Sequence, residues 1–209
     1  MPWVRWSGRT SERGLPARGP MTRMFVAVTP PVEAVEHLDA FLEVRRAAGP
    51  FRWAPAEHLH LTLAFLADVP ERKLDDLVER LGRAATRRSA FETAVAGGGA
   101  FPNVTRAKVL WAGLDLDEAG RTELSRAATG ARAAANRAGV PVDGQRFRPH
   151  LTLARLGHPD DVTGWVRLLD TYRGPAWTVS HLALVASYLG EGPRGRPRHE
   201  LLDTFPLSR

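Results

Sequence analysis

The chain of 209 residues contains no cysteine. Disulfide bonds, thiolate nucleophiles and cysteine-ligated zinc or iron–sulfur centres are therefore excluded. Long apolar runs are also missing, because no stretch of the sequence approaches the roughly 20 residues that a membrane-spanning helix needs. We therefore expect a cytoplasmic protein whose chemistry, if it is an enzyme, uses other side chains.

Lysine is scarce: Lys73 and Lys108 are the only two lysines among 29 basic residues, which leaves 27 arginines. The formal net charge is +6, but residues 1–23 hold five arginines against one glutamate and so carry +4 of it. The other 186 residues carry only +2. A net positive charge favours acidic partners such as nucleic acid. With so little charge on the body, we expect recognition by a few donors in a cleft rather than by a basic surface.

Residues 1–22 lack the apolar segment and the small-residue cleavage site of a signal peptide. We expect a disordered or non-native N-terminal extension over 1–22, followed by a single bilobal domain over 23–209. Met21 and Met24 are both plausible starts, because the first apolar run begins directly after them.

The rest of the sequence alternates short apolar strands with amphipathic helices. Frequent two-residue periodicity favours an α+β fold with antiparallel sheets over a doubly wound parallel sheet. Asp68 is expected to cap the second helix, and Gly97–Gly99 to form a flexible hairpin loop. We expect helices at 32–47, 70–88, 117–138 and 160–169, and strands at 24–28, 51–53, 59–66, 91–96, 107–114, 146–156, 177–188 and 198–205.

The strongest pattern is an internal repeat. A strand, a helix and a second strand occur in this order in both halves of the chain, and the second strand carries His-Leu-Thr-Leu at 60–63 and again at 150–153. Two similar halves predict a two-lobed, pseudo-symmetric domain of antiparallel sheets flanked by helices. We expect the active site in the central cleft.

The repeated tetrapeptide carries groups suited to phosphate chemistry. Alternation along a strand places His60 beside Thr62, and His150 beside Thr152, on a common face. The two hydroxyls can hold a phosphate while one imidazole removes a proton and the other donates one. Imidazoles with a pKa near 6.5 share these roles at neutral pH without metal or cysteine. A single His-x-Thr is common in strands, whereas two copies at equivalent places of a repeat indicate function.

These motifs resemble the paired HxTx motifs of the 2H phosphoesterases. The similarity is strongest to the RNA 2′,3′-cyclic phosphodiesterases, also called LigT-type 2′-5′ RNA ligases, and it covers nearly everything from Met24 to Leu207. Departures are Leu66-Ala67, where the family often has Leu-Gly, and His199, where it often has a tyrosine. They affect loop geometry and the edges of the substrate site rather than the histidine pair.

The resemblance implies a metal-independent enzyme that opens an RNA 2′,3′-cyclic phosphate to a 2′-phosphomonoester. It implies His60 as proton donor to O3′, His150 as the base that activates water, and Thr62 and Thr152 as phosphate ligands. From the sequence alone, the two histidines are nearly equivalent and either role fits either one. The same pair acting in reverse would perform 2′-5′ ligation without ATP.

Several other side chains are weaker candidates. Arg148 shares the face of His150 and is expected to bind phosphate, whereas Arg155 would need a bulge in its strand to reach that face. His58 and His60 have the spacing of a metal pair, but no third ligand is placed, so we expect no metal and no cofactor. Trp53, Phe25 and Trp111, which could stack on a base, are interpreted as core residues.

Three alternatives remain open. The chain could act on 2′-5′ oligoadenylate, on a small cyclic nucleotide such as ADP-ribose 1″,2″-cyclic phosphate, or bind RNA without turnover. The expected partner is RNA with a 2′,3′-cyclic phosphate end, such as a tRNA fragment. We expect a monomer.

Overall fold

The computed structural model describes residues 21–49, 51–144 and 146–208. The first strand begins at Met21, two residues before the expected domain boundary, and Thr22 is buried and pairs with Val69. Residues 21 and 22 are thus part of the folded domain, and the rest of the expected extension lies outside the described residues.

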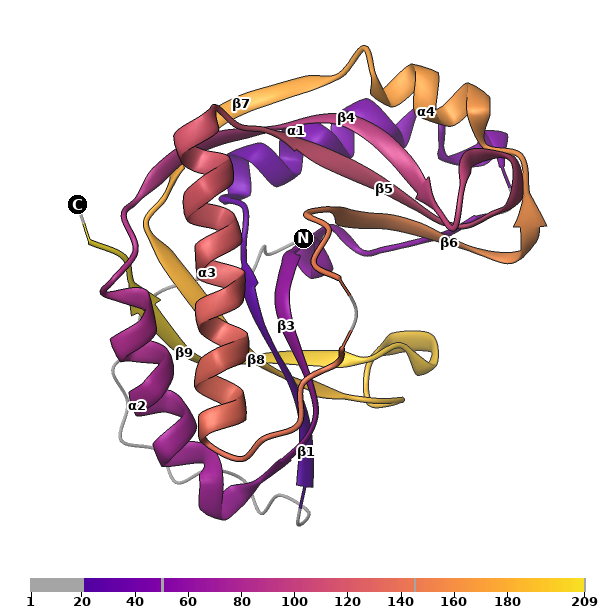
Figure 1. Cartoon of the computed structure of the whole chain (residues 1–209). Helices are drawn as coiled ribbons and strands as arrows, with labels where there is room; N and C mark the ends of the chain where they lie inside the picture. The colour runs from indigo at the N-terminus through magenta and orange to yellow at the C-terminus, as the bar shows by residue number, and fades with distance from the viewer. Residues whose placement is uncertain (1–20, 50, 145, 209) are drawn as a thin grey trace.

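Within the described residues, nine strands form one curled antiparallel sheet, in the order β7-β4-β5-β6-β3-β1-β8-β9, with β2 paired to β6 (Figure 1). The strands are β1 Met21–Val28, β2 Arg52–Trp53, β3 Leu61–Pro70, β4 Phe91–Phe101, β5 Ala107–Asp115, β6 Leu151–Asp160, β7 Arg173–Val179, β8 His181–Tyr188 and β9 Arg198–Pro206. The helices are α1 Val32–Glu43, α2 Leu74–Ala85, α3 Glu118–Arg137 and α4 Thr163–Leu169. The α+β prediction is confirmed.

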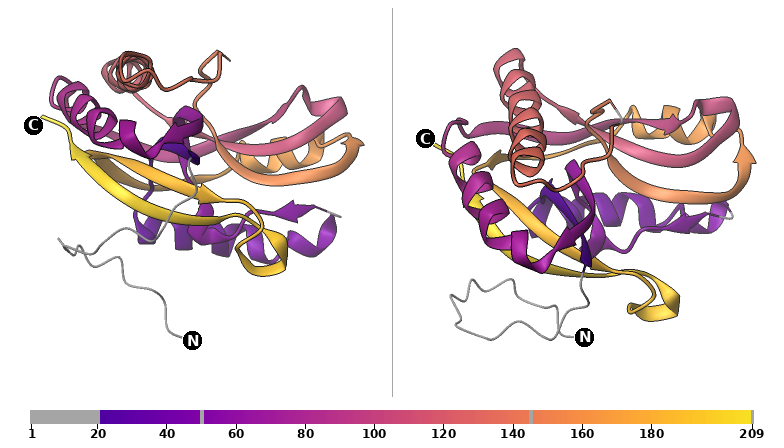
Figure 2. Two further views of the ribbon diagram at one scale, coloured as in Figure 1. Left: turned by 90° about the horizontal axis from the view of Figure 1, so that it is seen from below. Right: turned by 60° about the horizontal axis from the view of Figure 1, so that its bottom comes forward.

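The sheet consists of two halves related by a pseudo-two-fold axis. One half has the order β3-β1-β8-β9 and the other β6-β5-β4-β7, and the central strands β3 and β6 meet at the pair Leu61–Leu151. These two leucines occupy the same position of the repeated tetrapeptide. The predicted pseudo-symmetry is therefore present, but as one continuous sheet whose halves diverge from a single central contact (Figure 2).

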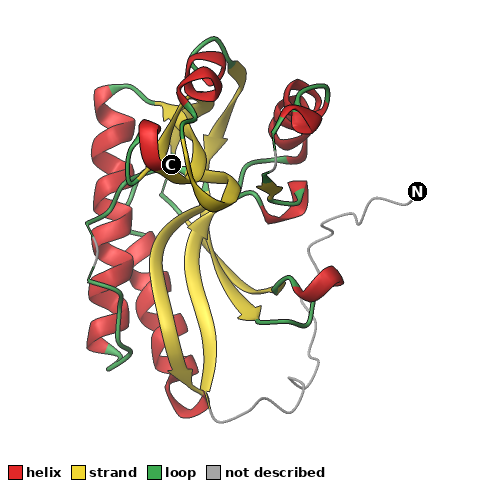
Figure 3. Cartoon of the chain, turned by 90° about the vertical axis from the view of Figure 1, so that its right-hand side faces the viewer, coloured by secondary structure: helices red, strands yellow, loops and turns green. Residues whose placement is uncertain are grey.

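Each half of the curled sheet is covered by its own pair of helices, and Figure 3 shows helices on either side of the strands. Helices α2 and α3 pack on the first half, where Leu77 and Leu124 join its core, and α1 and α4 pack on the second, where Leu38 and Leu169 do so. Helix α1 follows strand β1 of the first half but packs on the second half. Helix α3 follows strand β5 of the second half but packs on the first half. This exchange ties the two halves together. No helix in the described ranges is long and apolar enough to cross a membrane.

Three expected features are wrong. Asp68 caps no helix, because β3 continues past it to Pro70 and α2 begins only at Leu74, after a 3₁₀ turn. The expected strand 177–188 is two strands that break at Ser180 and lie in opposite halves of the sheet. The run Gly97–Gly99 lies inside β4 and is not a hairpin loop.

A large side chain on the neighbouring strand explains the glycine run. Gly99 pairs with Trp111, and a Cβ atom at Gly99 would lie 2.2 Å from the Trp111 indole. Since no real side chain tolerates this approach, glycine is needed here for room rather than for flexibility.

Candidate active site

Each motif histidine lies immediately before its strand, since β3 begins at Leu61 and β6 at Leu151. Both strands were expected to begin earlier. The imidazole Nδ1 of His60 is 2.7 Å from the carbonyl oxygen of His58, and that of His150 is 2.7 Å from the carbonyl oxygen of Arg148. The same side-chain bond to the residue two positions back therefore fixes both rings.

This bond determines which ring nitrogen is available for chemistry. A carbonyl oxygen only accepts, so Nδ1 must carry the proton and donate in both histidines. The other nitrogen, Nε2, then has a free lone pair in the neutral ring and a proton to give in the charged ring. Each imidazole thus presents Nε2 as its acid–base atom.

The central strand pair brings the two motifs together. Leu61 and Leu151 are paired and both are buried towards the helices. An ideal antiparallel register continued by one residue in each direction predicts His60 opposite Thr152 and Thr62 opposite His150. The charge of His150 acts on the pKa of His60, so the two imidazoles lie close to each other at the centre of the sheet.

Equivalent β-bulges follow the two motifs. Ala27 pairs with Thr62 and Val26 with Ala64, so Leu63 is an extra residue on β3. In the other half, Trp111 pairs with Thr152 and Leu110 with Ala154, so Leu153 is extra on β6. Both extra leucines are buried in their cores.

The bulge on β6 turns Arg155 towards the site. Val109 pairs with Arg155 two residues from Trp111, so Arg155 lies on the same face as Thr152 despite its odd spacing. Strict alternation would place Arg155 on the opposite face, and this bulge is the feature that it needed to reach the face of His150. Phe65, paired with Phe25, occupies the equivalent position in the first half.

The His60 ring is enclosed by other rings. It stacks on Phe25 with centroids 4.4 Å apart, and the His199 ring meets it nearly edge-on at 5.6 Å. His199 in turn stacks on His58 at 4.3 Å. The pKa of His60 and that of His199 are each lowered to about 4, mainly by burial and in part by neighbouring imidazoles, although the carbonyl of His58 favours a charged His60.

The His150 ring is more open. The Phe101 ring lies perpendicular to it with the ring centroids 4.8 Å apart, and the Trp111 ring is tilted with its centroid 6.2 Å away. Its pKa is lowered, first by burial and further by the charge of Arg155, while the carbonyl of Arg148 opposes the shift. Next to this ring is an open pocket of about 440 Å³, lined by Phe101, Trp111 and the segment Arg146–Pro149.

The two expected arginines flank this second histidine. Arg148 supplies the carbonyl that holds His150, and its guanidinium lies 5.9 Å from the Phe101 ring centroid at the edge of the pocket. Arg155 is exposed and close enough to affect the pKa of His150.

Sequence reasoning missed the rings that position the histidines. Phe25 was interpreted as core, and it is buried, but the ring on which it packs is His60. Phe101 was not singled out. His199 appeared only as a departure from the family pattern. Trp53 is a core residue, in contact with Phe51 and Trp165.

His58 is engaged by His199 rather than arranged as a metal ligand, since the two rings are stacked. In the part of the chain that the structure describes, no group of three or more His, Asp or Glu side chains is arranged to hold a metal ion.

Comparisons with known proteins identify the family. The sequence matches the model of the LigT-like phosphoesterases over residues 28–111 and 114–194. An RNA 2′,3′-cyclic phosphodiesterase of Thermus thermophilus is 33% identical over 194 residues, which cover 88% of this chain and 90% of that protein. One of the same name from Geobacillus stearothermophilus is 36% identical over 132 residues, 63% of this chain but 41% of that relative.

The structure agrees with these matches. The crystal structure of Escherichia coli LigT in apo form superimposes with a TM-score of 0.72 at 26% identity, over 91% of this chain and all of that one. The same enzyme has been crystallised with 3′-AMP, and that structure gives a TM-score of 0.70 at 27% identity over 90% of this chain and 99% of that one. With both motifs, the bulged central strands and the curled sheet in place, the chain belongs to the LigT-like phosphoesterase family.

Proposed function

We propose that the protein hydrolyses 2′,3′-cyclic phosphate ends of RNA to 2′-phosphomonoesters by general acid–base catalysis with two histidines. The observation that carries this proposal is the matched pair of imidazoles, each with Nδ1 donating to a carbonyl oxygen 2.7 Å away, which leaves Nε2 as its acid–base atom. The names of the curated relatives supply the substrate class. The 3′-AMP complex of E. coli LigT is consistent with a nucleotide ligand.

In this mechanism the two histidines act on opposite sides of the phosphorus. Nε2 of one imidazole removes a proton from water as the water oxygen attacks phosphorus. The bond between phosphorus and O3′ breaks, and O3′ takes a proton from Nε2 of the other imidazole. The products are a 2′-phosphate and a free 3′-hydroxyl, and exchange of protons with solvent restores the pair.

We assign proton donation to His60 and activation of water to His150, following the family pattern. In the free protein, burial lowers the pKa of His60 to about 4. A donor role therefore requires the negative phosphodiester to raise this pKa when the substrate binds. With the 5′-hydroxyl of a second RNA in place of water, the same steps would join it to the cyclic end in a 2′-5′ linkage: the base removes the hydroxyl proton as its oxygen attacks phosphorus, and O3′ again leaves with a proton from the acid.

The phosphate is held by hydroxyl and guanidinium groups on the same face. Thr62 and Thr152 each follow a motif histidine by two residues, and their hydroxyls can donate to the non-bridging oxygens. Arg155 and Arg148 add charged donors from the second half. The groups named here recognise the phosphate rather than the identity of a base.

The test is turnover of an oligonucleotide ending in a 2′,3′-cyclic phosphate, with the 2′- and 3′-monoester products separated. We expect the 2′-monoester alone, and turnover unchanged by EDTA. Formation of the 3′-monoester, or a higher kcat/KM for 2′-5′ oligoadenylate or ADP-ribose 1″,2″-cyclic phosphate, would overturn the assignment. RNA binding without turnover would indicate the non-catalytic alternative.

The pH dependence provides a second test. One histidine must be neutral and the other charged, and the pKa values of both are lowered in the free protein. Since kcat/KM reports the free enzyme, its bell-shaped profile should have its maximum below pH 6.5. Because bound phosphate raises both pKa values, the kcat profile should lie at higher pH. A kcat/KM maximum above pH 7 would contradict the burial of these rings.

The expectations of a cytoplasmic location and of a monomer remain predictions. Gel filtration of the active enzyme checks the monomer.

A further inference from the structure

An arginine-lined groove lies between α2 and α3, away from the histidines. It has a volume of about 680 Å³, and no carboxylate is among its described lining residues. Its floor is made by small side chains where the helices approach, such as Ala84, whose Cβ is 3.7 Å from a Cβ placed at Gly130. The arginines that line it are Arg80, Arg83, Arg87, Arg88, Arg126 and Arg137.

Acidic side chains around the groove neutralise only part of its charge. Arg80 pairs with Asp76 and Arg83 with Glu79, each one helical turn away. Glu123 is shared by two further arginines of the groove, as described below. Three carboxylates thus face six arginines, and neither Arg87 nor Arg137 has an ion pair within the described ranges.

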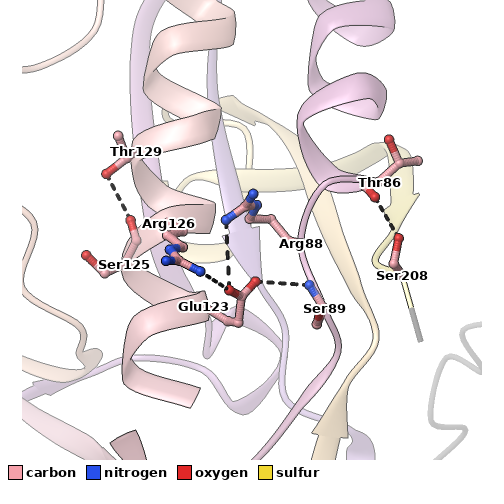
Figure 4. A network of polar contacts seen from close by, with 8 residues as sticks. All are labelled: Thr86, Arg88, Ser89, Glu123, Ser125, Arg126, Thr129 and Ser208. Carbon is pink, nitrogen blue, oxygen red and sulfur yellow. Dashed lines mark hydrogen bonds and ion pairs between the residues drawn. The ribbon is translucent and has the colours of Figure 1, made fainter. Parts of the chain in front are cut away.

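One carboxylate organises the end of the groove (Figure 4). Glu123 accepts hydrogen bonds from the Ser89 backbone N–H at 3.0 Å and from Arg126 at 3.0 Å, and it lies 3.9 Å from Arg88. These contacts lower the pKa of Glu123, the Ser89 bond most of all. Glu123 therefore stays charged and fixes guanidinium groups from both walls.

The chemistry of the walls indicates a chain of phosphates. Guanidinium groups bind phosphate oxygens in pairs and remain charged at every physiological pH. Exposed ion pairs such as Arg83–Glu79 contribute little, so a phosphate can replace their carboxylates at small cost. A membrane surface is disfavoured, because none of the exposed large apolar side chains among the described residues belongs to α2 or α3.

We propose that this groove binds the phosphate backbone of the same RNA whose end is processed in the cleft. This inference rests on the proposed function. It also revises the expectation of recognition by cleft donors alone: the net charge of the body is small, but six of its arginines line one groove.

Strand β9 connects the two places. Its first half carries His199, which contacts His60, and just past its end Ser208 bonds through its hydroxyl to the carbonyl of Thr86 and through its N–H to that of Arg88. Nine residues of strand span on the order of 30 Å. Because α2 and α3 cover the face of the sheet opposite the histidines, an RNA that reaches both the groove and the histidines must pass around the edge formed by β9. At about 3.4 Å per stacked nucleotide, roughly ten nucleotides are needed.

The test compares long and short substrates for one pair of variants. Arg87→Gln/Arg137→Gln removes two groove charges without leaving a carboxylate unpaired. Arg106→Gln/Arg167→Gln removes two exposed charges elsewhere and serves as the control. Substrates are a dinucleotide and a 20-nucleotide single-stranded RNA, both with 2′,3′-cyclic phosphate ends, and thermal unfolding verifies that both variants are folded.

For the groove variant we expect KM for the 20-mer to rise about tenfold, and the slope of log affinity against log salt for a 3′-hydroxyl 20-mer to fall by about 1.4. Its kcat and KM for the dinucleotide should equal those of the wild type, and the control should change the 20-mer KM less than about twofold. If both variants raised the KM for the 20-mer equally, the RNA assignment would be overturned. It would also be overturned if the groove variant lost as much affinity for poly-glutamate as for the 20-mer.

Failure of the proposed function is separately visible. If the wild type does not hydrolyse the dinucleotide, the catalytic assignment fails, whereas the binding of the 3′-hydroxyl 20-mer still reports on the groove. If the groove variant itself unfolds, Arg83→Gln, with Arg106→Gln as its control, gives the same comparison at half the charge change.

Discussion

The two halves of the sheet present the same imidazole and hydroxyl pair but support it from different strands. In the first half, the ring that packs on His60 is Phe25 of the inner strand β1. In the second half, the ring that packs on His150 is Phe101 of strand β4, which lies one strand further from the centre of the sheet. The equivalent cross-strand pairs are Phe25–Val185 and Val109–Phe101, so large and small residues are exchanged between the strands.

A second exchange lies next to the threonines. Ala27 and Ala183 are paired in the first half, whereas Trp111 and Gly99 are paired at the equivalent place in the second. Two small residues are replaced by one very large and one without a side chain. The first exchange keeps the same two residue types on exchanged strands, whereas the second places a much larger side chain in the second half, where the glycine on the paired strand makes room for it.

The halves differ most in charge. At equivalent positions after the bulges, the first half has Phe65 and the second Arg155. His60 is enclosed by Phe25 and His199, while His150 lies beside guanidinium groups and an open pocket. The first half therefore supplies apolar ring surface and the second supplies positive charge for phosphate.

The largest expected effect is loss of either imidazole. His60→Ala and His150→Ala should each lower kcat at least about 100-fold, the usual contribution of a positioned acid or base. Because the two act in one step, the double variant should be far less than multiplicatively worse. Single-turnover kinetics on a cyclic-ended oligonucleotide measure this. If one single variant retained wild-type kcat, the two halves would not be chemically equivalent.

The next effect tests the exchange of volumes. Gly99→Ala places a methyl group against the Trp111 indole and should lower the free energy of unfolding by about 1–3 kcal/mol. Gly157→Ala is the control, since nothing lies within 4 Å of a Cβ there, and it should change stability by less than about 0.5 kcal/mol. Denaturant unfolding gives both values, and equal stabilities would show that β4 and β5 adjust freely.

These examples show what the sequence could and could not predict. The histidine and threonine pairs were visible because strand alternation is local and the tetrapeptide occurs twice. The bulges at Leu63 and Leu153 were not, because they depend on hydrogen bonding to β1 and β5. Gly97–Gly99 was misinterpreted because the residue that requires Gly99 is Trp111, on another strand.

A smaller effect should come from making the halves alike in charge. Arg155→Phe gives the second half the residue of the first and should lower kcat/KM about tenfold, as one charge-assisted phosphate contact is lost. It should also raise the pKa of His150, because the nearby positive charge is removed. Phe65→Leu is the matched change in the first half and should have little effect on kcat/KM. Equal losses would mean that Arg155 acts only through packing.

The smallest effect concerns stability in acid. His60 and His199 are held neutral by burial, with pKa values of about 4, whereas an unfolded chain protonates histidine below about pH 6.5. Their contribution is therefore complete above pH 6.5 and is lost as the pH falls towards 4, because the unfolded state then binds more protons. His199→Phe keeps a ring against His58 but removes one titrating group, so its melting temperature should fall less than that of the wild type between pH 7 and pH 5. Carboxylates such as Glu123, whose pKa is already lowered, titrate at still lower pH and do not interfere. If the variant and the wild type lost equal stability over this range, the enclosure of the first half would not be the source of its acid sensitivity.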